Sequence, residues 1–459
     1  MEATAKKQLD MLHGPIWNKI PRFALPIAAT AILGQLFNAA DIAVVGNFTG
    51  ELRTASVAAV SATSSIIGLV VNLFIGVSLG ANVTIAYAVG RDDRQAVSRA
   101  VHTAIVMAVL GGVLSAVLGE LAAAPLLRAL HTPEDVLPLS LLYLRIYFAG
   151  LPVILLYNFE AAIFRSVGET KIPLIALTLS GVLNVLLNLF FVAVLHMTVD
   201  GVATATVLSN AVSAAILYRY LRRRSKAVHV EPGQLRIDKS SMKRILSIGL
   251  PAGVQSAVFS VANIIIQGAI NSLGTVVMAA SGAAFNIEII TYDILNSFSQ
   301  ACTTFVGQNY GAGEIGRCKK TLGLCLGEGI TALVVAIAVI LPLGKPLLSI
   351  FNNDPQVVDV GYIRLVTLMT AHLFSLCYEV LSGYLRGFGI SLAPAVLTMA
   401  GVCGIRLSWI YFVFPKNPAF QTIMVVFPIS LAATALLMLI AVLCYRPARR
   451  FTLAQGTSK

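Results

Sequence analysis

The sequence carries little charge: Asp, Glu, Lys and Arg make up 12% of its 459 residues, about half the share found in an ordinary soluble domain. Hydrophobic residues make up 57%, and the mean hydropathy is +0.83. The exposed faces of a soluble protein need charge, and so few polar side chains cannot cover them. The composition excludes a water-soluble globular protein and predicts a chain that folds in lipid.

Cysteine is scarce and follows no pattern. The six cysteines form no Cys-x-x-Cys pair and have no His pattern beside them, which argues against a zinc site or a disulfide framework. The glycine-rich stretch 307–313 lacks the Gly-Lys-Ser/Thr ending of a phosphate loop and is interpreted as a turn between spans. No cofactor is expected apart from a coupling ion. Residues 1–16 contain no short apolar core, so a cleaved signal peptide is not expected.

Long apolar runs are what the sequence has in abundance. They are continuously rich in Leu, Ala and Val and do not alternate with period two, so they predict helices and not a closed barrel. Twelve runs are long enough to cross a membrane. They fall near residues 18–46, 55–79, 98–123, 137–162, 172–195, 201–219, 245–270, 275–301, 320–342, 357–384, 391–414 and 420–444.

The cationic residues predict the orientation. With the N-terminus inside, 26 of the 33 Lys and Arg fall in inner segments, four fall in outer loops and three fall within spans. This asymmetry places both termini in the cytoplasm of a multi-pass plasma (inner) membrane protein. It also explains the net charge of +12 without a nucleic-acid partner. The outer four are Arg53, Arg128, Lys345 and Lys416, and the three in spans are Arg145, Arg364 and Arg406.

The chain divides into two similar halves. Arg165-x-x-Gly168 recurs as Arg386-x-x-Gly389, displaced by 221 residues. Six spans per half give both copies the same orientation, so we expect two six-helix bundles related by a pseudo-two-fold axis along the membrane normal. Further matches are Gly90 with Gly311 and Leu25-Pro26 with Leu250-Pro251. The expected division is an N-terminal bundle at 1–218, a cytoplasmic linker at 219–244, a C-terminal bundle at 245–445 and a cytoplasmic tail at 446–459.

Polar side chains within the first six spans mark a candidate ion site. Gln35, Asn38 and Asp41 follow one stripe of a helix at i, i+3 and i+6. A charged side chain in a span is costly, so Asp41 is interpreted as functional. Asn184 and Asn188 share a helix face at i, i+4, and Thr206 lies in the next span; interhelical hydrogen bonding explains these three equally well. Glu160 and Glu120 lie near predicted span ends, where we expect them to contact water.

The second half carries more intramembrane acids. Glu288 and Asp293 are five residues apart, so both cannot point squarely at one site. Glu379 either pairs with Arg386 or lies at the interface, and Arg364 and Arg406 are available to neutralise acids of this half. Candidate residues for substrate binding or a second coupling site are Glu288, Asp293, Glu379, Asn263 and Tyr292.

These motifs, in this order over essentially the whole chain, resemble the multidrug and toxic compound extrusion (MATE) family of secondary transporters. Each motif is weak alone, and the set is specific. The residues that carry the resemblance are Leu25-Pro26, Gln35-x-x-Asn38-x-x-Asp41 with Gly46, Asn184-x-x-x-Asn188, Gly201 to Thr206, Phe305 to Gly313 and Leu385-Arg-Gly-Phe-Gly389.

The resemblance implies a monomeric antiporter in which a cation gradient drives export of small organic molecules, mostly cations or amphiphiles, by alternating access. In similar proteins the acid that matches Asp41 takes part in proton or sodium coupling, and the positions that match Asn184, Asn188 and Thr206 surround it. Many relatives have Asp where this chain has Asn188. One carboxylate with neutral oxygens suits sodium, and a lone buried carboxyl suits a proton, so the coupling ion stays open.

Two other functions compete with this one. A lipid-linked oligosaccharide or peptidoglycan-precursor flippase shares the superfamily architecture, but it must hold pyrophosphate, and the interiors of the first two spans contain no Lys or Arg. An integral membrane transferase needs clustered Asp, His or Glu at the membrane surface, and the sequence has no such cluster. Membrane lipid is expected around the protein in every case, and enzymatic activity is not expected.

Overall fold

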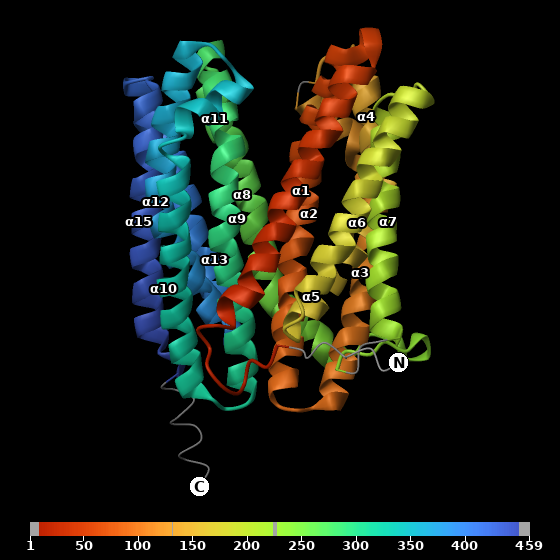
Figure 1. Ribbon diagram of the computed structural model, residues 1–459, viewed down its shortest axis with the longest axis vertical. Coiled ribbons are helices and arrows are strands. Elements are labelled where there is room, and N and C mark those ends of the chain that lie inside the picture. The colour runs from red at the N-terminus through yellow and green to blue at the C-terminus, as the bar shows by residue number, and fades with distance from the viewer. Residues whose placement is uncertain (1–8, 131, 224–226, 449–459) are drawn as a thin grey trace. The chain divides into compact units, whose positions relative to one another are not determined.

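The computed structural model describes residues 9–130, 132–223 and 227–448, and every regular element in them is a helix (Figure 1). The first half contains α1 (Ile20–Phe48), α2 (Arg53–Gly90), α3 (Arg94–Ala129), α4 (Leu137–Ala149), α5 (Leu151–Ser166), α6 (Lys171–Asn188) and α7 (Val199–Arg223). The second half contains α8 (Lys239–Asn271), α9 (Thr275–Gly311), α10 (Ile315–Ile340), α11 (Gly344–Phe351), α12 (Pro355–Gly387), α13 (Leu392–Thr398), α14 (Ile405–Phe412) and α15 (Phe420–Tyr445).

Five short helices of other pitch are also present in the described residues. Two are π-helices, η2 (Leu189–Val194) and η4 (Met399–Gly404), and each continues a spanning α-helix. Three are 3₁₀ turns: η1 (Gly50–Leu52), η3 (Pro232–Gln234) and η5 (Phe414–Lys416). Because π-bulges occur often at functional sites, it is relevant that η2 begins directly after Asn188.

The spans agree with the sequence. Within the described residues, eleven helices are long and apolar enough to cross a membrane, and the bent pair α4–α5 makes a twelfth. The two helices of this pair meet at 50° because Gly150 and Pro152 interrupt the chain there. The predicted twelve-span, all-helical membrane fold is therefore confirmed.

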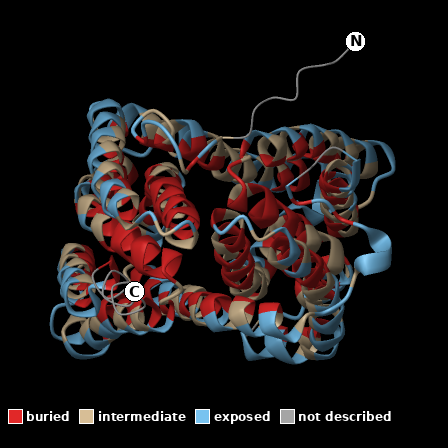
Figure 2. Cartoon of the chain, turned by 90° about the horizontal axis from the view of Figure 1, so that it is seen from below, coloured by how far each residue is buried: buried red, intermediate tan, exposed pale blue. Residues whose placement is uncertain are grey.

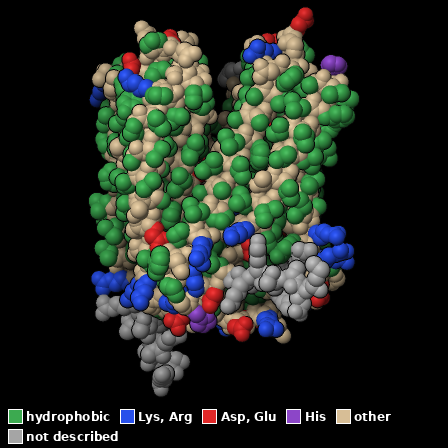
Figure 3. All heavy atoms as spheres, viewed as in Figure 1, with side chains coloured by type: hydrophobic (Ala, Val, Ile, Leu, Met, Phe, Trp, Pro, Cys, Tyr) green, Lys and Arg blue, Asp and Glu red, His purple; other side chains and the backbone are tan. Residues whose placement is uncertain are grey.

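The outer faces of the helices suit a lipid environment. Leu114, Leu118 and Leu121 lie along one face of α3 and are 58%, 56% and 73% exposed. Figure 2 shows that the buried positions of each unit lie toward the inside of its helix bundle. Figure 3 shows hydrophobic side chains covering the sides of the helices, with Lys and Arg mainly near helix ends. Exposed hydrophobic faces of this extent would be unfavourable in water, and they suit contact with lipid.

Two compact units make up the fold, and their boundaries cut through two helices. Unit 1 holds Ala29–Gly253, and unit 2 holds Asp10–Ala28 with the described residues from Val254 onward. Thus α1 starts in unit 2 and ends in unit 1, and α8 does the reverse. Of the predicted linker 219–244, α7 occupies the start and α8 the end, and 224–226 lie outside the described residues; so does most of the predicted tail 446–459.

Paired glycines join the first part of α8 to α2 within unit 1. Gly76 and Gly80 of α2 face Gly249 and Gly253 of α8, each pair four residues apart. A Cβ on Gly76 would lie 2.2 Å from the backbone nitrogen of Gly253, and one on Gly80 would lie 2.1 Å from the carbonyl oxygen of Ile245. Small residues at this spacing let two membrane helices approach closely.

The backbone conformation at the repeated Arg-x-x-Gly motif is the same in both halves of the chain. Gly168 and Gly389 both have positive φ, 84° and 82°, and each follows a helix that ends near the repeated arginine. The amide of Gly168 donates to the carbonyl of Arg165 at 3.0 Å, and that of Gly389 donates to Arg386 at 2.8 Å. These equivalent helix ends, 221 residues apart, support an internal duplication.

The structure corrects the turn predicted at 307–313. Helix α9 continues to Gly311, and the turn itself follows at 312–314. In the last turns of this helix Asn309 is buried, and its side-chain amide donates to the carbonyl of Phe305 at 2.7 Å and to that of Met11 at 3.2 Å. Gly313 lies in the turn as predicted, with a φ of 79°, whereas Gly307 and Gly311 lie in the helix, since glycine is frequent inside membrane helices.

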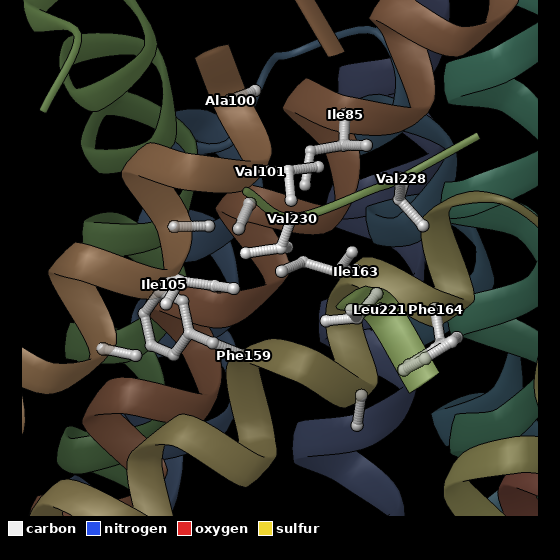
Figure 4. Close-up of a cluster of buried hydrophobic side chains, with 14 of the residues drawn as sticks. Ile85, Ala100, Val101, Ile105, Phe159, Ile163, Phe164, Leu221, Val228 and Val230 are labelled. Atoms are coloured by element: carbon white, nitrogen blue, oxygen red, sulfur yellow. The ribbon is translucent and has the colours of Figure 1, made fainter. Parts of the chain in front are cut away.

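The segment before α8 is part of the unit 1 core. Val228 and Val230 are fully buried in a cluster with Ile105, Phe159 and Ile163 (Figure 4). The imidazole of His102 accepts a hydrogen bond at Nε2 from the amide of Glu231 at 3.0 Å, and its Nδ1 lies 2.7 Å from the carbonyl of Ser98. Since a carbonyl can only accept, Nδ1 carries the proton in this arrangement. The predicted linker is thus fixed to α3.

Candidate functional site

Asp41 lies inside unit 1 and is 6% exposed. It belongs to α1, and its partners come from α6 and α7. The side-chain amide of Asn188 donates to Asp41 Oδ1 at 2.5 Å, and the hydroxyl of Thr206 lies 3.2 Å from Asp41 Oδ2. No cation of the described residues lies within 4.0 Å of the carboxylate. The acid is therefore held by neutral groups alone.

Two hydrogen bonds donated by the side-chain amide of Asn188 orient this side chain. Its Nδ2 donates both to Asp41 and to Asn184 Oδ1, the latter at 3.2 Å. This fixes the amide so that its oxygen points elsewhere, and Asn188 Oδ1 is buried without a hydrogen-bond partner among the described residues. A buried oxygen without a donor is costly unless water or a cation occupies the space beside it. The site thus offers a carboxylate and an unused carbonyl oxygen.

Thr206 can change partners. Its hydroxyl lies 2.9 Å from the carbonyl of Val202 on its own helix as well as 3.2 Å from Asp41. One hydroxyl proton can go to only one acceptor at a time. When Thr206 donates to Val202, its oxygen is left to face Asp41, which is the arrangement that a bound cation or a protonated Asp41 favours.

The structure brings together Asp41, Asn184, Asn188 and Thr206 but not the rest of the predicted stripe. Gln35 and Asn38 are exposed on α1, and no described hydrogen bond joins either of them to the Asp41 cluster. In the same helix, Phe37 packs against α6 at Gly181, where a Cβ would lie 1.8 Å from its ring. The face that meets α6 is therefore set by Phe37 and Asp41.

Unit 2 pairs its acids differently. Arg364 of α12 holds Glu288 of α9 with two hydrogen bonds, Nε to Oε2 at 3.0 Å and Nη2 to Oε1 at 2.5 Å. The sequence offered Arg364 as a cation for an acid of this half without naming its partner. Both side chains are buried. A bidentate pair neutralises Glu288 and fixes its position. The Glu288–Arg364 pair therefore connects α9 to α12.

The other unit 2 candidates are less constrained. Glu379 is buried, and the hydroxyl of Tyr292 donates to it at 3.4 Å. Arg386 does not pair with Glu379 within 4.0 Å; its Nη2 donates to Gln255 at 2.8 Å. Asp293 is 8% exposed, and its Oδ2 has no partner in the described chain. Asn263 is exposed on α8. A hydrogen bond thus joins Tyr292 to Glu379, and no described hydrogen bond joins Asp293 or Asn263 to these two residues.

The described residues include no group of three His, Cys, Asp or Glu that could hold a metal ion. The family model described as MatE matches residues 26–190 and 251–412, one match in each half of the chain. The chain belongs to the MatE family. This confirms the resemblance read from the motifs, and MATE proteins are multidrug efflux transporters.

Curated relatives agree with this assignment. The chain is 26% identical over 400 residues to "Probable multidrug resistance protein YpnP" of Bacillus subtilis, with 87% of this chain and 89% of that protein covered. It is 26% identical over 399 residues to "Probable multidrug resistance protein NorM" of Thermotoga maritima, covering 85% and 84%. It is 25% identical over 363 residues to a protein named "FAD transporter" from Shewanella oneidensis, covering 77% and 78%.

Solved structures have the same fold. The structure titled "Crystal structure of MATE in the bent conformation" matches with a TM-score of 0.88 at 20% identity, over 99% of this chain and 100% of that one. "Outward-facing conformation of a multidrug resistance MATE family transporter of the MOP superfamily" matches with the same TM-score and coverage. The MATE fold thus covers essentially the whole chain.

Glu160 is the acid that sequence reasoning placed wrongly in this MATE chain. We expected it near a span end in contact with water, but it is 0% exposed and neither carboxyl oxygen has a partner among the described residues. The reason is the segment after α7, whose Val228 and Val230 pack into the same cluster as the neighbours of Glu160 on α5. That cover comes from about 70 residues further along the chain and leaves no local signal.

Arg406 is a second residue of note in unit 2. It is 9% exposed and has no carboxylate within 4.0 Å in the described part of the chain. Its Nε donates to the hydroxyl of Ser430 at 3.0 Å, and its guanidinium lies 4.3 Å from the centre of the Phe427 ring. Unlike Arg364, it is therefore stabilised by a hydroxyl and an aromatic face.

Proposed function

We propose that this MATE protein is a secondary antiporter that exports amphiphilic, cationic organic compounds in exchange for protons or sodium ions by alternating access. It works as a monomer in the plasma membrane with both termini in the cytoplasm. Energy comes from the ion gradient, because the sequence has no phosphate loop.

One observation carries the proposal: the Asp41 carboxylate is buried in unit 1 with only neutral partners. A carboxylate in a membrane span is expensive to keep and marks an ion pathway by default. If the group served stability alone, a cation beside it or an apolar replacement would be more favourable. A single negative charge that must be neutralised by a mobile cation explains the arrangement.

Both coupling ions fit the same atoms. A proton on Asp41 neutralises the carboxylate directly and leaves the hydrogen bond from Asn188 on the other oxygen. Sodium, as a hard cation, takes oxygen ligands, and the oxygens on hand belong to Asp41, Asn188, Asn184 and Thr206. Many relatives have Asp where this chain has Asn188, so here Asp41 alone gives the four-residue cluster its negative charge. One bound proton or one sodium ion therefore neutralises the cluster.

The substrate proposal relies on unit 2. Asp293 and Glu379 are acids without a cation within 4.0 Å in the described chain, and Tyr292 adds an aromatic ring beside Glu379. Anionic and aromatic groups attract organic cations through charge and cation–π contacts. Of the alternatives, a pyrophosphate-binding flippase is less favoured because the interiors of the first two spans contain no Lys or Arg and because Glu288 neutralises Arg364 in unit 2.

The deciding experiment measures transport of a fluorescent organic cation such as ethidium in proteoliposomes, without ATP, under an imposed proton gradient or an imposed sodium gradient. We expect transport under at least one gradient. Asp41→Asn keeps size and hydrogen bonding but removes the charge, and we expect it to lower the gradient-driven rate by about tenfold or more, a change of ~1.4 kcal/mol or more.

The matched control is Glu120→Gln, which removes an exposed carboxylate, 48% accessible and paired with Arg145. It should transport at the parent rate. The coupling proposal fails if Asp41→Asn folds, binds ethidium and transports at the parent rate under both gradients. The exporter proposal fails if ethidium and related cations move only when ATP is supplied.

A further inference from the structure

Two pockets lie at the end of unit 1 where α2 turns into α3. The smaller, of about 190 Å³, is lined by residues of α2, α3 and the start of α8, among them Thr84, Arg91, Arg99 and Arg244. The larger, of about 440 Å³, is lined by α3 and the segment before α8, among them Arg99, His102, Arg236 and Lys239. Arg99 lines both, so the pockets adjoin at this side chain.

The pockets hold a surplus of positive charge. Five cationic residues line them, and the two acids among the lining residues are Asp93 and Asp238. No cation among the five has a carboxylate within 4.0 Å in the described chain. The five are Arg91, Arg99, Arg236, Lys239 and Arg244.

The two acids are occupied by helix capping. Asp93 accepts the amide of Ala96 at 2.9 Å at the start of α3. Asp238 accepts the hydroxyl of Ser240 and the amide of Ser241, at 2.5 and 2.8 Å, at the start of α8. These hydrogen bonds, with the positive charge of Arg99 nearby, lower the pKa of Asp238 to about 2. Both carboxylates thus cap helix N-termini, and the cations of the pockets are available to bind another anion.

The smaller pocket also contains groups that are set in place for a ligand. Thr84 is one of its lining residues, and the hydroxyl of this side chain is buried without a hydrogen-bond partner among the described residues. The guanidinium of Arg244 lies 3.9 Å from the centre of the Tyr87 ring, which holds it in position. A buried hydroxyl without a partner is costly, and a bound oxyanion that accepts from it removes that cost.

We propose that unit 1 binds a phosphate ester here, with the phosphate group in the smaller pocket against Thr84, Arg91, Arg99 and Arg244, and with the polar remainder of the molecule in the larger one. Arginine is the residue best suited to phosphate because its planar group donates two parallel hydrogen bonds. A pocket of about 440 Å³ falls within the usual size range of small-molecule sites. Two sources share this chemistry: the headgroup of an anionic phospholipid and a soluble phosphate monoester.

The test uses the full chain purified in detergent and two probes that share a glycerol phosphate group, which is a diester in the lipid and a monoester in the soluble probe. Phosphatidylglycerol is titrated and counted by native mass spectrometry, and glycerol 3-phosphate is titrated by calorimetry, with glycerol and phosphatidylcholine as the matched probes without net negative charge. We expect one bound molecule of at least one anionic probe. Binding of the lipid alone assigns a headgroup site, and binding of glycerol 3-phosphate assigns a soluble ligand.

Three variants locate the site. Arg99→Gln and Lys239→Gln each remove one lining charge from an exposed side chain and should weaken binding by about tenfold and about threefold. Thr84→Val removes the buried hydroxyl at constant size; it should also weaken binding, although without a ligand it should leave thermal stability unchanged or higher. The control is Arg222→Gln, an exposed cation at the end of α7 that lines neither pocket.

The proposal is overturned if neither anionic probe binds better than its neutral match. It is also overturned if Arg222→Gln weakens binding as much as Arg99→Gln, since the attraction would then come from the general positive charge of this end of the protein. Equilibrium binding is the readout, so the result does not depend on which ion drives transport.

Discussion

At the scale of single residues, the buried acids of this MATE protein are treated in three ways. Asp41 is held by neutral donors, Glu288 is paired with Arg364, and Glu160 has no partner among the described residues. An unsatisfied buried polar group destabilises a fold by about 1–3 kcal/mol. Such a cost persists only where it serves a purpose or where an unseen water satisfies the group. Glu160 is the residue where these two explanations can be separated.

We expect Glu160→Met to raise the free energy of unfolding by about 1–3 kcal/mol, because it replaces an unsatisfied carboxyl with an apolar side chain of similar length. In a thermal unfolding assay in detergent this corresponds to an increase in apparent Tm of about 2–4 °C per kcal/mol. Glu120→Met is the matched control on an exposed glutamate and should change the stability by less than ~1 kcal/mol. A fall in Tm for Glu160→Met would indicate that water or an ion satisfies the acid.

At the scale of helices, the close backbone approach between α2 and α8 is a contact that tolerates little change. A Cβ on Gly80 meets a carbonyl oxygen of the facing helix at 2.1 Å, and a backbone atom cannot turn away as a side-chain tip can. The same α8 contains Gly268, where a Cβ meets nothing within 4 Å. The two glycines have the same intrinsic helix propensity and differ only in their surroundings.

Gly80→Ala should therefore destabilise unit 1 by about 1–3 kcal/mol through overpacking, whereas Gly268→Ala should be neutral or stabilise by about 0.5–1 kcal/mol through lower backbone entropy in the unfolded chain. Apparent Tm and the yield of monodisperse protein are the measurements. Equal effects of both variants would mean that glycine flexibility, and not the α2–α8 contact, is what matters at position 80.

The elements were largely predictable from the sequence because each span is a continuous apolar run. The bend between α4 and α5 was not predicted, since residues 137–162 are apolar throughout and the break depends on Gly150 and Pro152. In the candidate site, the sequence predicts Asp41, Asn184, Asn188 and Thr206, whereas the helical stripe that groups Gln35 and Asn38 with Asp41 is not reproduced by the contacts. Spacing along one helix does not reveal which neighbour covers each position, and the cover over Glu160 comes from a distant segment.

At the scale of the whole molecule, orientation remains a prediction from the distribution of cations, 26 in inner segments and four in outer loops. A single cysteine placed at Lys345 or Lys416 should react with a membrane-impermeant maleimide on intact cells, and one at Arg236 should react only after the cells are opened. All three positions are exposed. The exposed native Cys444 is first replaced by Ser so that it does not contribute. Labelling at Arg236 on intact cells would reverse the orientation.

The division of α1 between the two units determines the order in which the newly made chain can fold. Residues 10–28 are synthesised before all of unit 1 from Ala29 onward, yet they belong to unit 2, where the ring of Phe23 packs edge-on against Phe305 at 5.7 Å. About 280 residues separate these rings, so at ~5–20 residues per second the start of α1 waits roughly 14–56 s for its partner. Unit 1 likewise lacks its last helix segment until residues 239–253 have been made. During biosynthesis unit 1 can close only once residue 253 has been made, and unit 2 only later in the second half, so the membrane insertion machinery must hold an incomplete protein for that time.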